Sequence, residues 1–261
     1  MEKQINYLVE KTWAKFQTLP SNERLLIAIS GIPGSGKTTL AQTVTTRLNS
    51  LHTKTTNSTT PIATMIPMDG YHLTRAQLAA IPNSDEAIFR RGAAFTFDAD
   101  SYLKLVKKLR APLILSDESD PDVGIVYAPS FDHALKDPIE NDIPVPPTSR
   151  ILLIEGLYLS LGSSNLPKPK FDTPSEAWAQ AGNLMDSHWF ISVPLETAGE
   201  RLVKRHLASG ICESEEWARK RVWESDLRNG REILEGRREF RAGVDEEVES
   251  VEDGGWRCGD R

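Results

Sequence analysis

The chain has 261 residues, of which 39% are hydrophobic and 26% are charged, and its formal net charge is −6. This composition is typical of a soluble globular enzyme, and the acidic balance argues against a nucleic-acid partner, which requires a broad basic face. No apolar run reaches the roughly 18 residues of a membrane span, and the first residues lack a signal-peptide core. We therefore expect a cytoplasmic protein with no membrane association. The two cysteines form no metal-ligand pair.

The first 110 residues are predicted to alternate helices and strands. Apolar residues such as Leu8 and Trp13 recur at helical spacing, and the nearly continuous apolar run at 24–30 is typical of a central parallel strand that is covered on both faces. In chain order, we expect a helix at 3–19, a strand at 24–30, a helix at 37–48, a polar connection at 50–60, a strand at 61–68, and helical pieces over 73–110 that are broken at Pro82 and near Gly92.

The remainder of the chain is predicted to continue this alternation after a long loop. Residues 111–149 hold seven prolines and many acidic residues, so we expect mostly loop there, with a short extended piece at 123–127. In chain order, we then expect a strand at 150–156, an exposed excursion at 162–185, a strand at 188–193, helices from about 195 and over 215–231, a last strand at 247–252 and a frayed tail at 257–261. Strands that alternate with helices indicate a parallel α/β sheet, here in a single domain over residues 1–261.

The segment 31–38 fits the phosphate-binding loop pattern Gly-x-x-x-x-Gly-Lys-Thr, and it lies between a predicted strand and a predicted helix, as the motif requires. Glycines let several backbone N–H groups face one anion, and the helix N-terminus adds its dipole. Lys37 can reach the β- and γ-phosphates, and the Thr38 hydroxyl can bind Mg²⁺. The sequence therefore predicts a site for Mg²⁺ and ATP. The predicted nucleotide-binding residues are Gly31, Gly34, Ser35, Gly36, Lys37, Thr38 and Thr39.

Two carboxylates follow predicted strands and are expected near this loop. Glu155 ends an apolar run, and an acidic residue at such a strand end orders the magnesium shell in folds of this kind. Asp69 follows the strand predicted at 61–68, where it can accept the proton of an attacking hydroxyl. Water hydrolysis needs a similar base, and an Asp before Gly70 is also a common turn pairing, so Asp69 alone does not separate a kinase from an ATPase.

The helix predicted from residue 195 carries a basic face. Arg201, Lys204 and Arg205 stand at i, i+3 and i+4, and His206 flanks them. Arginine holds phosphate with a planar, permanently charged fork, so this face is expected to belong to a lid over about 195–231 that closes on transferring phosphates. The alternative is a solvated helix face. No Asn-Lys-x-Asp run is present to read guanine, which disfavours a GTP switch.

Six segments, taken in order, resemble the phosphoribulokinase/uridine kinase family of small-molecule kinases. They are residues 31–39, 69–72, 90–98, 127–133, 154–156 and 201–205. The resemblance implies a P-loop NTPase fold with three α/β/α layers, a parallel five-stranded central sheet and a helical lid. It also implies phosphoryl transfer from ATP to an alcohol group of a small metabolite. Because the family contains many dimers, a homodimer is one expected assembly.

The resemblance also implies roles for individual residues. Asp69 matches the general base, and Lys37, Arg201 and Arg205 match residues that stabilise the transferring phosphate. Thr38 and Glu155 match the magnesium residues of the family. The implied acceptor-pocket residues are Tyr71, His72, Arg91, Asp132 and His133.

The chain departs from uridine kinases in the segment that would hold the acceptor. Those enzymes carry Asn-Phe-Asp-His-Pro where this chain has residues 90–94, so that Gly92 replaces the acid that would hold a ribose diol. The Arg-Arg-Gly version resembles the pantothenate-kinase branch and suggests an acceptor with an anionic group. The chain also resembles fungal family members that share its Asp-Gly-Tyr-His segment and have no assigned acceptor.

Several functions remain open at this point. The acceptor can be pantothenate, uridine, a sugar, glycerate or another small alcohol. The alternative to a kinase is a nucleotide-binding regulatory ATPase, in which ATP-driven closure presents a surface such as residues 111–149 to a partner.

Overall fold

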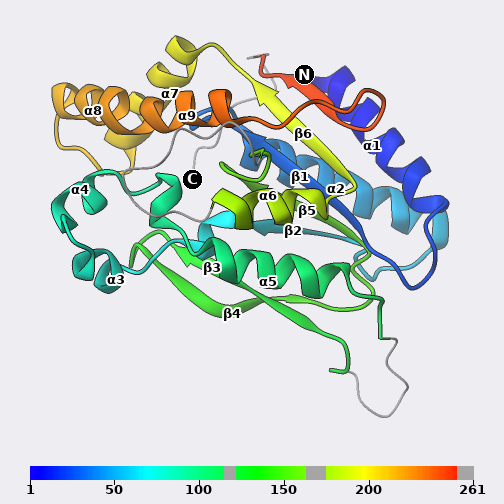
Figure 1. Cartoon of the computed structure of the whole chain (residues 1–261). Helices are drawn as coiled ribbons and strands as arrows, with labels where there is room; N and C mark the ends of the chain where they lie inside the picture. Colours follow the sequence, from blue (N-terminus) through cyan, green and yellow to red (C-terminus); the bar gives the residue numbers. More distant parts are fainter. Residues whose placement is uncertain (115–121, 163–174, 252–261) are drawn as a thin grey trace.

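A five-stranded, all-parallel sheet forms the centre of the molecule (Figure 1). The computed structural model describes residues 1–114, 122–162 and 175–251. In spatial order the strands are β2 (Ala63–Pro67), β5 (Ile151–Gly156), β1 (Leu25–Gly31), β6 (Ser187–Ser192) and β7 (Glu246–Glu249). This arrangement confirms the predicted α/β fold with a parallel five-stranded sheet.

Helices cover both faces of the sheet, so the fold has three layers (Figure 1). Helices α1 (Glu2–Gln17) and α2 (Lys37–Thr56) pack on one face, and α5 (Ala99–Arg110) and α6 (Ser175–Asn183) pack on the other. Successive side chains of a strand point to opposite faces. Thus Leu25, Ile27 and Ile29 of β1 contact the α1–α2 layer, whereas Leu26 and Ala28 belong to the α5–α6 layer.

The strand register places the ends of three strands at one edge of the sheet. Glu155 of β5 pairs with Ile29 of β1 on one side and with Pro67 of β2 on the other. All three strands run in the same direction, so the loop after Gly31, the turn η1 (Met68–Tyr71) and Glu155 meet at the carboxyl ends of the strands. In open parallel sheets this edge is where ligands bind.

The long proline-rich segment was expected to be mostly loop, and this prediction is wrong for its second half. Strands β3 (Val126–Asp132) and β4 (Asp137–Val145) form an antiparallel hairpin. The hairpin has only two strands, so each has a free edge at which a residue without an N–H is tolerated. Pro129 falls at an irregularity of the register, between Ala128 and Ser130. Part of the segment, 115–121, lies outside the described residues.

Two further predictions need correction. Residues 50–56 belong to α2, in which the hydroxyls of Thr55 and Thr56 donate to carbonyls one turn back. The helix ends at Thr56 and is followed by Asn57, whose φ of 57° is left-handed. Residues 175–183 form α6 instead of an exposed excursion, and Trp178, only 1% exposed, packs in the core. Residues 163–174 of that excursion lie outside the described part of the chain, as do Cys258 and the tail expected at 257–261.

The remaining helices gather at one end of the molecule (Figure 1). The segment predicted as a lid begins with α7 (Leu195–Ala208) and continues through α8 (Glu215–Arg221), the π-helical turn η3 (Val222–Asp226) and α9 (Leu227–Gly236). These four elements surround a small hydrophobic cluster of their own, which also includes Ile32 of the loop after β1. Short helices α3 (Arg75–Ala80) and α4 (Ser84–Phe89) and the turn η2 (Ala94–Thr96) lie between β2 and α5 in the chain, as the predicted helical pieces required.

Candidate active site

The loop between β1 and α2 has the backbone shape of a phosphate cradle. Gly34 and Gly36 have left-handed φ angles of 79° and 93°. A Cβ atom on Gly34 would lie 2.7 Å from the carbonyl oxygen of Ala198 on α7, so this position requires glycine for both conformation and space. The Lys37 Nζ atom is buried at this loop and donates to the Ile32 carbonyl at 3.0 Å. The lysine is therefore already held where a bound phosphate would meet it.

A hydroxyl and a carboxylate meet beside the loop. Thr38 Oγ1 donates to Glu155 Oε1 at 3.2 Å, and Glu155 is buried. Burial, together with the nearby Asp69 charge, raises the pKa of Glu155 to about 7, while Lys37 and Thr38 oppose this effect. Oxygen atoms of this kind are the ligands that Mg²⁺ prefers, with waters and substrate phosphates completing its shell. Within the described ranges, no group of three His, Cys, Asp or Glu residues could hold a metal ion by itself.

Asp69 lies next to this pair but is more accessible. Its side chain is 42% exposed, and its charge is felt by both Glu155 and His72. Gly70 permits the turn that carries it, because a Cβ atom there would lie 2.3 Å from the Pro129 carbonyl oxygen of β3. The structure therefore places an accessible carboxylate between the phosphate loop and the β3–β4 hairpin.

The predicted lid arginines lie on the side of α7 that faces the loop. Arg201 Nη1 donates to the Gly34 carbonyl at 3.3 Å and to Ser250 Oγ at 2.9 Å. Arg205, one turn further along α7, is exposed, and its charge helps lower the pKa of Glu155. His206 instead points into the lid, where its Nε2 atom lies 2.7 Å from Asp226 Oδ2. The basic face therefore approaches the phosphate loop without His206.

Two of the predicted acceptor residues lie together on the other side of Asp69. The His72 ring lies between the rings of Phe97 and Phe131, with centroids 4.0 and 5.0 Å away, and its Nδ1 atom is 2.9 Å from the Asp69 carbonyl. Burial lowers the pKa of His72, and the Asp69 carboxylate opposes that effect. The Arg91 guanidinium stacks over Phe131 at 5.4 Å. Aromatic and basic groups therefore line this side of the site.

The other three predicted acceptor residues are placed differently. Tyr71 is buried in the core, where its ring meets Tyr102 edge-on at 5.4 Å. Burial raises the pKa of Tyr71. Asp132 Oδ1 accepts from the backbone N–H groups of residues 134 and 135 at 2.7 and 2.9 Å, which fixes the hairpin turn. His133 lies exposed on that turn, with its ring 5.2 Å from Phe131.

Sequence reasoning missed Asp137, the first residue of β4. Its Oδ1 atom accepts from the Arg75 backbone N–H at 2.8 Å and from Arg91 Nη2 at 3.3 Å. It therefore joins the hairpin to α3 and to the Arg91 segment. A hairpin prediction for 126–145 would have pointed to this residue, because Asp137 pairs with Asp132 across the turn. Ser250, which contacts Arg201, was not among the predicted site residues either.

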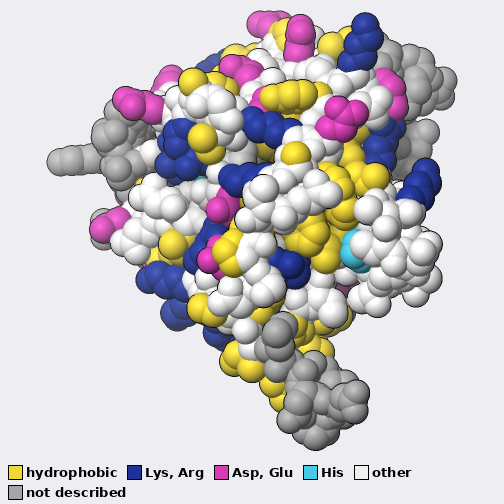
Figure 2. Space-filling model, turned by 90° about the vertical axis from the view of Figure 1, so that its right-hand side faces the viewer, with side chains coloured by type: hydrophobic (Ala, Val, Ile, Leu, Met, Phe, Trp, Pro, Cys, Tyr) yellow, Lys and Arg dark blue, Asp and Glu magenta, His cyan; other side chains and the backbone are white. Residues whose placement is uncertain are grey.

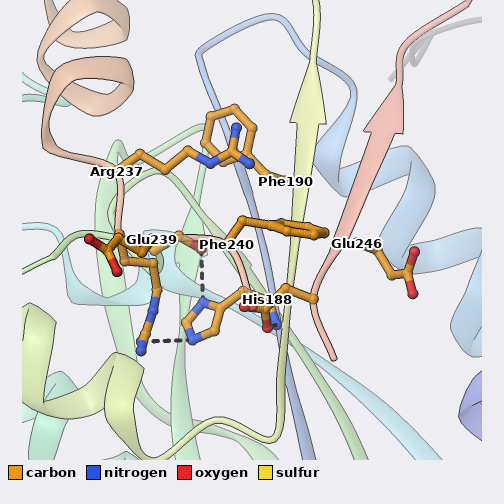
Figure 3. Close-up of a pocket in the computed structure, with 9 residues that line it drawn as sticks. His188, Phe190, Arg237, Glu239, Phe240 and Glu246 are labelled. Carbon is orange, nitrogen blue, oxygen red and sulfur yellow. Dashed lines mark hydrogen bonds between the residues drawn. The ribbon is translucent and has the colours of Figure 1, made fainter. Parts of the chain in front are cut away.

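Two cavities lie away from this edge of the sheet. A groove of about 410 Å³ lies between the end of α2 and the start of β5. A pocket of about 10 Å³ lies beside β6, where Arg238 and Ser160 hydrogen-bond the buried ring of His188 (Figure 3). This second space has room for a single water molecule and is too small for a nucleotide.

On the face drawn in Figure 2, Lys and Arg side chains are scattered among polar and hydrophobic ones and form no single broad patch. Within the described part of the chain, we find no helix with the length and apolar character that a membrane span needs.

Comparison with known proteins places this geometry among kinases. No family model matches the chain. It is 45% identical over 170 residues to the ATP-dependent kinase-like protein notR' of Aspergillus versicolor, a match that covers 65% of this chain and 88% of the relative. It is 36% identical over 213 residues to the "Putative uridine kinase" of Schizosaccharomyces pombe, over 82% of this chain and 79% of the relative.

A solved structure shows the same fold. The crystal structure of YFH7 from Saccharomyces cerevisiae, a P-loop kinase fold with a circular permutation, superimposes with a TM-score of 0.74. The superposition covers 95% of this chain and 99% of that one, at 21% sequence identity.

Proposed function

The chain belongs to the phosphoribulokinase/uridine kinase-like family of P-loop kinases, and from this membership we propose that it transfers the γ-phosphoryl group of Mg-ATP to an alcohol group of a small metabolite. One observation carries the proposal beyond nucleotide binding. Asp69, an accessible carboxylate, stands beside the Thr38–Glu155 pair and next to His72, whose ring packs on Phe131 of the hairpin.

The nucleotide side of the reaction rests on the phosphate loop. The backbone N–H groups of this loop would hold the β- and γ-phosphates, and Lys37 would exchange its Ile32 carbonyl for a phosphate oxygen. Thr38 and Glu155 would hold Mg²⁺ directly or through water, and the bound ion would neutralise charge on the phosphates. Arg201 and Arg205 would stabilise the negative charge that spreads over the transferring group.

The acceptor side rests on Asp69. The acceptor oxygen would attack the γ-phosphorus in line with the bond that joins it to the β–γ bridging oxygen. As the new P–O bond forms and the bridging bond breaks, the hydroxyl proton would pass to Asp69 and ADP would leave. His72 and Arg91 would position the acceptor, because their side chains border the space next to Asp69. To bind a carboxylate or phosphate group of the acceptor, the Arg91 guanidinium would exchange one of its present acceptors, which are the Leu73 and Lys136 carbonyls and Asp137.

The decisive experiment measures ADP release from Mg-ATP against a panel of alcohols that contains pantothenate, uridine, nicotinamide riboside, glycerate and several sugars. The proposal predicts that one compound strongly stimulates release and that a phosphorylated product appears in equal amount. Steady ADP release that no alcohol changes, with inorganic phosphate as the sole product, would contradict it. An Asp132→Asn variant is a useful control, because that carboxylate serves the hairpin turn.

A further inference from the structure

The short segment 89–92 lies between the lid helices and the β3–β4 hairpin. Its two neighbouring arginines point in different directions. Arg91 contacts the hairpin side: its guanidinium donates to the Lys136 carbonyl at 2.5 Å and to Asp137, and also to the Leu73 carbonyl at 2.9 Å. Arg90 contacts the lid side, where its Nη2 atom donates to Asn229 Oδ1 at 2.5 Å.

The contact of Arg90 with the lid is buried. Only 4% of Arg90 and 1% of Asn229 are exposed, and Glu232 Oε1 lies 3.3 Å from the same Nη2 atom. A buried charge depends on its partners far more than an exposed one, because water cannot replace a lost hydrogen bond. The position of α9 is therefore tied to the position of this arginine.

Neighbouring backbone atoms strengthen the same connection. The Phe89 carbonyl accepts from Ser225 Oγ at 3.3 Å and from Arg221 Nη1 at 3.5 Å, so the π-helical turn and the end of α8 also hold the segment. Gly92 has a left-handed φ of 107°, which lets the chain turn directly after the two arginines. A displacement of the lid would consequently move residues 89–92 as a unit.

We propose that Arg90 is a positioning residue that transmits the nucleotide-dependent position of the lid, through Arg91, to the acceptor-side hairpin. The inference rests on the proposed function, since it assumes that Mg-ATP closes the lid. Arg90 acts through its neighbour and contacts neither substrate. The consequence is that the acceptor side becomes ordered when ATP is bound, which limits transfer of the phosphoryl group to water.

The Nε atoms of Arg90 and Arg91 offer independent support. Both are buried, and neither has a hydrogen-bond partner in the described structure. Buried donors are almost always paired, so each exception calls for an explanation, and the Nε atoms of Arg221 and Arg238 are in the same condition. A second position of residues 89–92, in which both donors find partners, would account for the two that are adjacent here.

The test is amide hydrogen exchange of the full chain with and without Mg²⁺ and a non-hydrolysable ATP analogue. In the wild type, the analogue should slow exchange in α7–α9 and also in the hairpin, residues 126–145. In Arg90→Met, the lid should keep its protection and the hairpin should lose it. Coupling between sites in proteins is typically about 5- to 150-fold, so the lost protection should lie in that range.

Two further variants make the result specific. Arg228→Met is the matched control, because Arg228 is 49% exposed and also contacts Glu232, at 3.5 Å, without touching residues 89–92; it should behave as wild type. Asn229→Ala removes the other partner and should reproduce Arg90→Met, and it decides the question if Arg90→Met does not fold.

The outcomes separate the two proposals. The role of Arg90 is overturned, and the proposed function is not, by either of two results. One is hairpin protection that persists in both Arg90→Met and Asn229→Ala; the other is a wild-type hairpin that gains no protection although the analogue binds. A wild-type chain that binds no analogue overturns the proposed function together with this inference.

Discussion

The buried carboxylate at the phosphate loop leads to a quantitative prediction for the ligand-free protein. Burial raises the pKa of Glu155 from its ordinary 4.5 to about 7, so the folded state binds the proton more tightly than the unfolded state does. An acid whose pKa is raised on folding gives stability that is present at low pH and is lost as the pH rises through the folded value. The free energy of unfolding should therefore fall between about pH 4.5 and pH 8.

The size of the effect follows from the two pKa values. One pKa unit corresponds to ~1.4 kcal/mol, so ionising Glu155 in place costs on the order of 3 kcal/mol. Between pH 5 and pH 8, the wild type should lose roughly 2 to 3 kcal/mol relative to Glu155→Gln, whose amide has no charge to bury. Urea unfolding curves of both proteins at pH 5, 6, 7 and 8, without metal or nucleotide, measure this difference.

The control is Glu10→Gln, an exposed carboxylate on α1, which should follow the wild type at every pH. If the wild type and Glu155→Gln show parallel pH dependence, then Glu155 is already ionised at low pH in the folded state, and the argument from burial is refuted. A saturating amount of Mg²⁺ and ATP should flatten the wild-type curve if Glu155 is held ionised beside the metal, as proposed.

Three other substitutions test separate parts of the structure. Asp69→Asn should lower turnover in the ADP-release assay by about 10²- to 10⁴-fold while calorimetric ATP affinity stays within a factor of two or so, and unchanged turnover would remove Asp69 from the role of base. Gly34→Ala forces a left-handed φ of 79° on alanine and places its Cβ atom 2.7 Å from the Ala198 carbonyl oxygen. The ATP affinity measured by titration calorimetry should therefore fall by about tenfold or more. Wild-type affinity would show that the loop adapts. Trp178→Ala empties a site in the core and should reduce the free energy of unfolding in urea by about 3–5 kcal/mol, whereas a loss below about 1 kcal/mol would mean that α6 contributes little.

The sequence revealed those parts of the fold and site that depend on local patterns. Residues 25–29 are apolar because both faces of β1 are covered, and that run followed by a glycine-rich loop is recognisable without tertiary information. The same reasoning located β5 and β6 and set Asp69 and Glu155 at strand ends.

The hairpin and α6 were missed because their order comes from non-local contacts. Pro129, Pro138 and Pro144 argue for loop when read alone, yet a two-stranded ribbon with free edges accepts them. Trp178 is buried against Tyr102 and Tyr158, which are distant in the chain, so no periodicity near residue 178 could reveal its place. The role of Asp137 depends on that hairpin and was hidden for the same reason.

The hydrophobic cluster under the lid connects the stability of the lid to that of the phosphate loop. Ile32, one of the variable positions of the loop motif, is buried among Ala198, Leu202 and Leu227, and a Cβ atom on Gly230 would lie 3.4 Å from it. Local opening of α7–α9 would therefore remove the apolar support of the loop, and we expect the two to unfold together. Any compound that binds the loop should accordingly protect α8 from limited proteolysis.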